Sequence, residues 1–179
     1  MRRLLVPVLL LLVLGFSVPL AVGEDAPKTG ELKITSPVFE NNGILPPRYT
    51  CDGENINPPL MIKNVPRKAK SLALILDDQD APRGSYVHWI VWNIDPEIKD
   101  IKEDSVPEGA VEGTNDFKKR NYGGPCPPAR AHRYAFKLYV LDIRLNLETR
   151  STKAVLEKAM KGHILAQAQL LTSYKRVGK

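Results

Sequence analysis

The chain has 179 residues, of which 43% are hydrophobic and 26% charged, and its formal net charge is +6. This length is enough for one domain with an adequate core, so the fold needs no disulfide scaffold. The positive charge is mild and scattered. Its densest runs, residues 66–70 and 117–120, are short and lack interleaved aromatic side chains. These features exclude nucleic acid as the expected partner.

The first 23 residues have the pattern of a secretory signal peptide. Arg2 and Arg3 precede an apolar run over residues 4–16, and small residues follow at Ala21 and Gly23. This order predicts export and cleavage after residue 23. The alternative is an uncleaved membrane anchor over residues 4–22, because the apolar stretch is nearly long enough to cross a bilayer. In both cases we expect an extracellular or periplasmic-type location, a polar tether over residues 24–31 and a single domain over residues 32–179.

Short apolar runs alternate with turns rich in Pro, Gly and Asn after the tether, which predicts strands. Residues 71–78 (SLALILDD) are apolar on both faces and predict a central strand buried on both sides. Residues 86–94 (YVHWIVWNI) are β-branched and aromatic throughout and predict a second strand. Residues 134–143 and 163–174 alternate between the two faces and predict two more.

One segment, residues 151–162 (STKAVLEKAMKG), has a helical period. Its predicted apolar stripe consists of Val155, Leu156, Ala159 and Met160. Ser151 is placed to cap the start of this helix and Gly162 to end it. The predicted fold is therefore mainly β, an antiparallel β-sandwich with a peripheral helix and with function on its loops.

The two cysteines, Cys51 and Cys126, lie in loops rich in Gly, Pro and polar residues and form no CxxC motif. In an oxidising compartment they can form one disulfide that closes a long loop. Two free thiols are the alternative. The sequence leaves both open.

Polar side chains gather where predicted strands meet. Asp78 ends the strand 71–78 on the face of its leucines, Asp80 follows it, and His88 lies in the next strand. If a strand begins at His132, then His132 and Tyr134 share one face. A carboxylate, two imidazoles and a phenol would then meet at one end of a sheet. The structural alternative is that the acids form turns and the histidines are hydrogen-bonded structural residues.

The same residues carry a family resemblance. DDQDAP followed by HW (residues 77–82 and 88–89), and YGGPCPPARAHRY (residues 122–134), resemble the two signature regions of the phosphatidylethanolamine-binding proteins. This family is also called the Raf kinase inhibitor-like proteins, and its prokaryotic branch is the nearer match. Residues 36–60 and 162–176 resemble its N-terminal signature and its C-terminal strand. The resemblance therefore covers essentially the whole mature chain.

The resemblance implies a β-sandwich whose cavity binds an anion at one end, typically a phosphate-bearing head group. The implied ligand-binding residues are Asp78, His88, Gly124, Pro125, His132 and Tyr134. The implied supporting residues are Asp80, Pro82, Trp89 and Arg133. Two positions depart from the family pattern: Gln79 replaces a common proline, and Arg130 stands where glycine is frequent before the histidine.

Such a pocket would hold an anion by ordinary electrostatics. We expect the backbone N–H groups of Gly123 and Gly124 to approach an oxyanion closely, because glycine has no Cβ. His88 and His132 would each donate a hydrogen bond, and Asp78 would fix the tautomer of one imidazole. If either histidine binds phosphate as a cation, binding should weaken between about pH 6 and 8.

Three functions compete on this evidence. The first is a ligand-binding, regulatory module without turnover or cofactor, whose partner is a small anionic or phosphorylated ligand. The second is a serine protease inhibitor, an activity attributed to some members of the family, acting through the stretch 101–121. The third is a hydrolase with Asp78 and His88 as general acid and base.

Metal and membrane binding are both disfavoured. The run DDQDAPRG lacks the glycine and distal glutamate of a calcium loop, and no zinc motif is present. We therefore expect no metal site. No basic amphipathic helix is predicted, so membrane contact would come only from an uncleaved N-terminal segment.

Overall fold

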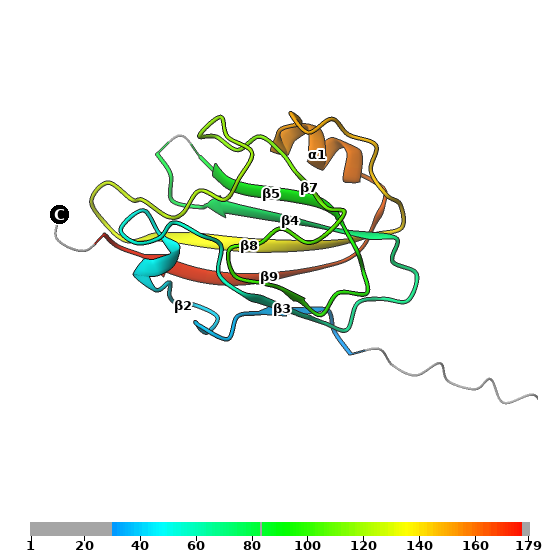
Figure 1. Cartoon of the computed structure of the whole chain (residues 1–179), viewed down its shortest axis with the longest axis horizontal. Helices are drawn as coiled ribbons and strands as arrows, with labels where there is room; N and C mark the ends of the chain where they lie inside the picture. Colours follow the sequence, from blue (N-terminus) through cyan, green and yellow to red (C-terminus); the bar gives the residue numbers. More distant parts are fainter. Residues whose placement is uncertain (1–29, 83, 177–179) are drawn as a thin grey trace, which may run out of the picture.

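The computed structural model describes residues 30–82 and 84–176, so the predicted signal segment and most of the tether lie outside the described residues. The described chain forms two β-sheets and one short helix (Figure 1). The larger sheet contains, in spatial order, β2 (Gly43–Ile44), β9 (Ile164–Tyr174), β8 (His132–Leu141), β4 (Ser71–Asp78), β5 (Tyr86–Ile94) and β7 (Val111–Glu112). The smaller sheet contains β1 (Lys33–Thr35), β3 (Leu60–Lys63) and β6 (Asp100–Ile101).

Strand pairing in both sheets is antiparallel, except that β2 runs parallel to β9. The predicted mainly-β sandwich with a peripheral helix is therefore confirmed. No helix in the described ranges is long and apolar enough to cross a membrane.

Strand β4 is buried along its whole length, as its sequence predicts. It lies between β5 and β8, and both of its faces are covered. Leu72, Leu74 and Leu76 face the core between the two sheets. Ala73 and Ile75 face a second core beneath the helix. Because each fully buried leucine or isoleucine contributes about 1.5–3 kcal/mol, this strand anchors both cores.

Helix α1 (Lys153–Met160) covers the outer face of the larger sheet (Figure 1). The predicted cap at Ser151 is wrong by one residue. Thr152 precedes the helix and makes no side-chain capping bond, while the backbone of Ser151 is tied to Glu148 and Thr114. Gly162 follows the helix with φ of 84°, as expected of the residue that ends it. Val155 is 44% exposed and does not belong to the buried stripe, because so short a helix buries only Leu156 and Met160 fully.

The two cysteines form a disulfide, which decides between the two alternatives that the sequence leaves open. The bond joins the loop after the 3₁₀ helix η1 (Pro47–Tyr49) to the loop before β8. Residues 101–121, the stretch considered as an inhibitory surface, are tied to the rest of the fold. Asn57 donates to the carbonyl of Lys102 and accepts from the N–H of Ser105, and β7 pairs with β5.

Candidate functional site

Four side chains implied by the sequence meet at one end of the larger sheet. This is the end where β9 finishes, near the C-terminus marked in Figure 1. Strand β4 ends at Asp78, directly opposite Tyr134 of β8. His132 begins β8, and His88 is the third residue of β5. Antiparallel pairing places the end of β4 beside the beginnings of β5 and β8, so residues far apart in the sequence become neighbours.

Asp78 and His132 form a buried pair. Oδ2 of Asp78 lies 2.7 Å from Nδ1 of His132, and the two side chains are 8% and 5% exposed. Oδ1 of Asp78 accepts a 2.8 Å hydrogen bond from the N–H of Asp80. An ionised carboxylate only accepts hydrogen bonds, so the proton of the imidazole lies on Nδ1. Asp78 therefore fixes the tautomer and orientation of His132.

His88 is held by the loop before β8 and enclosed by aromatic rings. Its Nδ1 lies 2.6 Å from the carbonyl oxygen of Gly123, which requires the proton on Nδ1 and leaves the lone pair on Nε2. The rings of Tyr86, Phe117 and Tyr134 present edges to it at 5.2–5.5 Å between centroids. Burial lowers the pKa of His88 from 6.5, and the hydrogen bond to Gly123 and the charge of Asp78 oppose this only in part. His88 is therefore neutral at pH 7.

Tyr134 lies at the centre of this cluster with its hydroxyl unpaired. The residue is fully buried, and its hydroxyl makes no hydrogen bond of full length and geometry among the described residues, although the carboxylate of Asp78 and the backbone of Cys126 lie near enough to affect its pKa. Burial and then the charge of Asp78 raise the pKa of Tyr134 above its usual range, so the hydroxyl keeps its proton. Native structures rarely leave a buried donor without an acceptor. The orphaned hydroxyl therefore marks a place where a ligand oxygen or a water molecule would be stabilised.

The glycine N–H groups do not have the role that the sequence predicts. Gly123 donates to the carbonyl of His88 at 3.1 Å, and Gly124 donates to Oδ1 of Asn55 at 2.7 Å. The expectation that these groups are free for an oxyanion is therefore wrong. A Cβ at Gly124 would lie 2.7 Å from the carbonyl oxygen of Tyr49, so this glycine allows two loops to pack closely. Pro125 is buried, and its carbonyl accepts from the N–H of Cys51.

Asp80 joins the loop after β4 to β8. Its carboxylate accepts three hydrogen bonds from Arg133, one from the backbone N–H and two from the guanidinium, at 2.7–2.9 Å. These bonds hold the pKa of Asp80 well below its usual range. Pro82 and Arg130 are exposed, on the loops after β4 and before β8. Trp89 packs in the core and donates from Nε1 to Glu112 at 2.6 Å, so it fixes β7 to β5.

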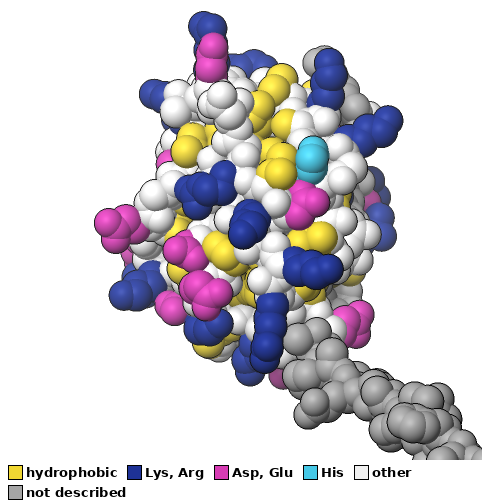
Figure 2. All heavy atoms as spheres, turned by 90° about the vertical axis from the view of Figure 1, so that its right-hand side faces the viewer, with side chains coloured by type: hydrophobic (Ala, Val, Ile, Leu, Met, Phe, Trp, Pro, Cys, Tyr) yellow, Lys and Arg dark blue, Asp and Glu magenta, His cyan; other side chains and the backbone are white. Residues whose placement is uncertain are grey.

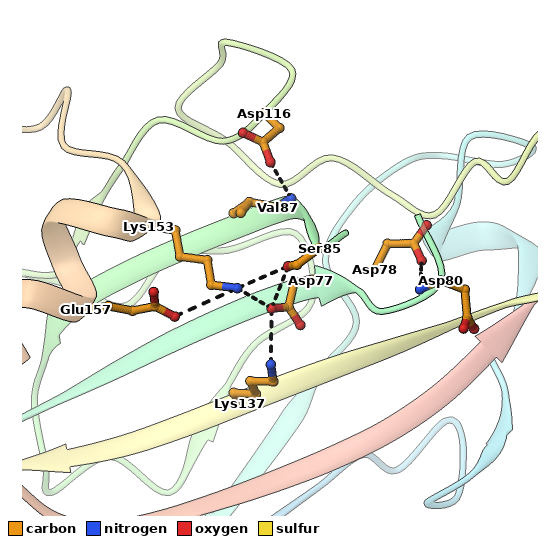
Figure 3. Close-up of polar contacts among 9 residues, drawn as sticks. All are labelled: Asp77, Asp78, Asp80, Ser85, Val87, Asp116, Lys137, Lys153 and Glu157. Atoms are coloured by element: carbon orange, nitrogen blue, oxygen red, sulfur yellow. Dashed lines mark hydrogen bonds and ion pairs between the residues drawn. The ribbon is translucent and has the colours of Figure 1, made fainter. Parts of the chain in front are cut away.

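Asp77 lies on the other face of β4, away from the cluster (Figure 3). Its Oδ2 accepts from Lys153 at 2.6 Å, from Ser85 at 3.0 Å and from Lys137 at 3.1 Å. Burial alone would raise the pKa of Asp77, but the hydrogen bond and charge of Lys153, with the charge of Lys137, outweigh it and lower the pKa. This acid links helix α1, the loop before β5 and β8.

Sequence reasoning missed two asparagines that shape the loops. Asn115 is buried and donates from Nδ2 to the carbonyls of His88 and Asn121. Asn55, with φ of 61°, provides the acceptor for Gly124. The available signal was an asparagine in a loop rich in Gly, Pro and polar residues, where its amide can replace backbone partners.

Two hollows lie beside the cluster. One, of about 260 Å³, is lined by residues that include Phe117, Gly123 and Gly124, and the other, of about 250 Å³, by residues that include Gln79 and Arg133. Asp78, His88, His132 and Tyr134 line neither of them and are 5% exposed or less. The predicted hollow ringed by these four side chains is therefore not one of these two. In the described ranges, no group of three or more His, Cys, Asp or Glu side chains is placed to hold a metal ion.

The fold and the cluster define a β-sandwich with a carboxylate, two imidazoles and a phenol buried at one end. A sequence profile of the phosphatidylethanolamine-binding protein family matches residues 35–175. The chain belongs to this family.

Relatives and solved structures agree with this assignment. A UPF0098 protein of Pyrococcus abyssi is 44% identical, with 97% of this chain and 99% of the relative covered. A UPF0098 protein of Methanothermobacter thermautotrophicus is 45% identical over 81% of this chain and 99% of the relative. The crystal structure of a putative phosphatidylethanolamine-binding protein homologue from Chlamydia trachomatis has a TM-score of 0.79 at 40% identity, and covers 82% of this chain and 99% of its own. YBCL of E. coli, described as a member of the mammalian family, has a TM-score of 0.77 at 29% identity with the same coverage.

Proposed function

We propose that this chain is an exported, regulatory binding module that holds a small phosphate-type anion, without turnover, at the buried polar cluster. The cluster consists of Asp78, His88, His132 and Tyr134. The description of the family, phosphatidylethanolamine-binding protein, supports a phosphate-bearing head group as the ligand class.

The observation that carries the proposal is the buried hydroxyl of Tyr134, which has no hydrogen bond of full geometry among the described residues. A buried donor without an acceptor costs about 1–3 kcal/mol, and an anionic oxygen would supply the missing acceptor. Hydrogen bonds to charged groups are also stronger than neutral ones. Ligand binding would thus recover free energy that the unliganded fold has lost.

The state of His88 limits which anion fits. A neutral His88 whose Nδ1–H is bonded to Gly123 can only accept a hydrogen bond through Nε2. The charge of Asp78 also disfavours a second full negative charge nearby. A ligand that carries a proton, as a P–OH group or a head-group ammonium, therefore fits better than a fully ionised anion.

Calorimetric titration with inorganic phosphate tests the role of the hydroxyl. Tyr134→Phe removes only that oxygen, so we expect binding to weaken about tenfold or more, while the free energy of unfolding is unchanged or slightly increased. Tyr139→Phe is the matched control, because Tyr139 lies on the opposite face of β8, beneath the helix. Equal affinity in the wild type and Tyr134→Phe would contradict the proposal.

The protonation of the ligand gives a second test on the same protein. A phosphate monoester loses its second proton near pH 6. We expect the binding of phosphoethanolamine, which keeps an ammonium group, to weaken less between about pH 6 and 8 than the binding of a simple phosphate monoester. Sulfate, which carries no proton in this range, should bind more weakly than phosphate. Sulfate binding as tightly as phosphate would contradict the role of His88 as an acceptor for a proton on the ligand.

A further inference from the structure

The far end of the sandwich, at Ser71, Leu141 and Ile164, lies opposite the polar cluster. Leu141, the last residue of β8, is the strand partner of Ser71 at the start of β4 and of Ile164 at the start of β9. His132 of the polar cluster begins β8, about 30 Å away over a strand of ten residues. Figure 2 views the far end, where hydrophobic side chains reach the surface between Lys and Arg side chains.

Cations gather at the far end without acidic partners. Residues 63–70 (KNVPRKAK), which begin at the end of β3 and lead to β4, contain no acid. The backbone N–H of Lys70 donates to the carbonyl of Leu141 at 2.8 Å, so this loop belongs to the far end. The cations of the loop are all exposed and form no salt bridge within the described residues. They are Lys63, Arg67, Lys68 and Lys70.

A fifth cation lies directly opposite one of these four. Lys33 of β1 and Lys63 of β3 are partners in an antiparallel strand pair, and both side chains are exposed. Like charges directly opposite each other destabilise such a pair. An anionic partner at the far end would therefore relieve a repulsion that is built into the fold.

Exposed hydrophobic side chains adjoin these cations. Ile164 and Leu165 are 43% and 39% exposed, and Ile164 pairs with the residue that accepts the bond from the cationic loop. Acidic side chains also lie at this end, but Asp142 is bonded to His163 at 2.9 Å. Membrane-surface binding combines buried apolar area with electrostatic attraction to anionic lipids. The far end offers both.

The chain also enters the fold at this end. The first described residue is Gly30, and the carbonyl of Glu31 accepts from Asn64 of the cationic loop at 2.9 Å. The sequence allows residues 4–22 to be a membrane anchor. Fully extended, the tether over residues 24–31 spans at most about 30 Å. An anchored domain is therefore held next to the bilayer, with its far end closest to the tether.

We propose that residues 4–22 are retained as an anchor and that the far end lies against a bilayer that contains anionic lipids. The cations of the far end contact lipid phosphates, and Ile164 and Leu165 enter the headgroup region. Each cation near such a surface contributes about 1 kcal/mol. Because the tether keeps the effective concentration high, contacts too weak for a free protein are sufficient.

The position of the tether favours a bilayer over a soluble acidic protein, which the same cations could attract. An anchored chain brings the membrane to the far end, whereas a soluble partner has no reason to meet that end first. The polar cluster then points away from the bilayer. The inference does not depend on the proposed function, because it uses none of the cluster residues.

Fluorescence quenching tests which end faces the bilayer. The full chain is reconstituted into vesicles of phosphatidylcholine with or without phosphatidylglycerol, with a quencher on the lipid headgroups. One added cysteine carries the fluorophore, because both native cysteines are bonded to each other. Lys161→Cys places the label at the far end, and Gln79→Cys places it near the polar cluster, both at exposed positions. In anionic vesicles we expect quenching at position 161 to be at least about twofold stronger, and the difference to shrink at high salt.

Charge reversal tests whether the cationic loop is responsible. Lys68→Glu with Lys70→Glu should at least halve the difference between the two labels. Lys118→Glu with Lys119→Glu is the matched control, because it reverses two exposed charges on the loop beside His88, and should leave the difference unchanged.

Three outcomes would overturn the proposal. The first is a full chain that does not sediment with the vesicles, because residues 4–22 would then be no anchor. The second is quenching at position 79 that equals or exceeds quenching at position 161. The third is an equal loss for both charge-reversed pairs, which would show a response to net charge and not to the far end.

Discussion

Asp77 and Asp78 are neighbours at the end of the same buried strand, yet they face different environments. Three donors converge on Asp77, and two of them are lysines that balance its charge (Figure 3). Asp78 accepts from His132 and from the backbone of Asp80, beside the unpaired hydroxyl of Tyr134. Asp77 also has one unpaired oxygen, but its charge is matched. The comparison teaches that burial alone does not distinguish a structural acid such as Asp77 from Asp78, the acid that we propose to act in ligand binding. The difference between the two acids lies in whether the polar groups around each one have partners of their own.

The largest expected effect comes from the disulfide, which joins the loop after η1 to the loop before β8, near Asp78. No such covalent bond holds the groups around Asp77. Replacing Cys51 and Cys126 together by alanine should lower the free energy of unfolding by about 4 kcal/mol, since the bond closes a loop with a sequence separation of 75. Phosphate affinity should fall as well, because the loop that holds His88 through Gly123 is released. Urea unfolding and calorimetry measure both effects. Reduction of the wild type should reproduce them, and an unchanged unfolding midpoint after reduction would contradict this account.

Removing the charge of Asp77 should lower the free energy of unfolding and leave phosphate affinity nearly unchanged. Asp77→Asn leaves Lys137 and Lys153 without their shared carboxylate, and we expect a loss of about 2 kcal/mol. This is less than for a fully buried pair because both lysines are partly exposed. Phosphate affinity should stay within about twofold, since the change lies on the opposite face of β4. Glu157→Gln, which removes a 3.8 Å contact to the same lysine, is the control and should cost under about 0.5 kcal/mol. A large drop in phosphate affinity for Asp77→Asn would show that the two faces are coupled.

The smallest effect is the pH dependence of stability that comes from His88. Because burial lowers the pKa of His88 from 6.5, the unfolded chain binds more protons than the folded chain just below that pH. The stabilisation is fully present above about pH 6.5 and is lost as the pH falls toward the lowered pKa. Unfolding free energies between about pH 5 and 8 should therefore decrease toward acid.

His88→Asn, whose amide can still donate to Gly123, should flatten this part of the profile. Asp77 and Asp80, whose pKa values are lowered, contribute in a separate window below about pH 4. A wild-type profile that rises toward acid would show that His88 is not held neutral.

The sequence was sufficient for the elements that depend on local pattern. The continuous apolar run at residues 71–78 favoured a strand covered on both faces, and β4 is that strand. The alternation at His132, Arg133 and Tyr134 correctly predicted which side chains share a face. The positions of the strand ends already brought His88 near the same cluster as one of two alternatives, and the resemblance favoured that alternative.

What the sequence could not reveal depends on partners far away in the chain. The N–H groups of Gly123 and Gly124 looked available because their acceptors, His88 and Asn55, lie tens of residues earlier. The donor Lys153, 76 positions after Asp77, could not be assigned from spacing either. The missing acceptor of Tyr134 is a property of packing in three dimensions.

The parallel pairing of β2 with β9 has a consequence for how the molecule is made. Gly43 receives a hydrogen bond from Thr172, 129 positions later, and β2 has no other strand neighbour among the described residues. The central pair β4 and β8 also joins segments about half a domain apart. Chains dominated by such distant pairings fold in milliseconds to seconds rather than microseconds. On the ribosome, the early strands must wait for β9, so this domain can complete its larger sheet only after Tyr174, the last residue of β9, has been synthesised.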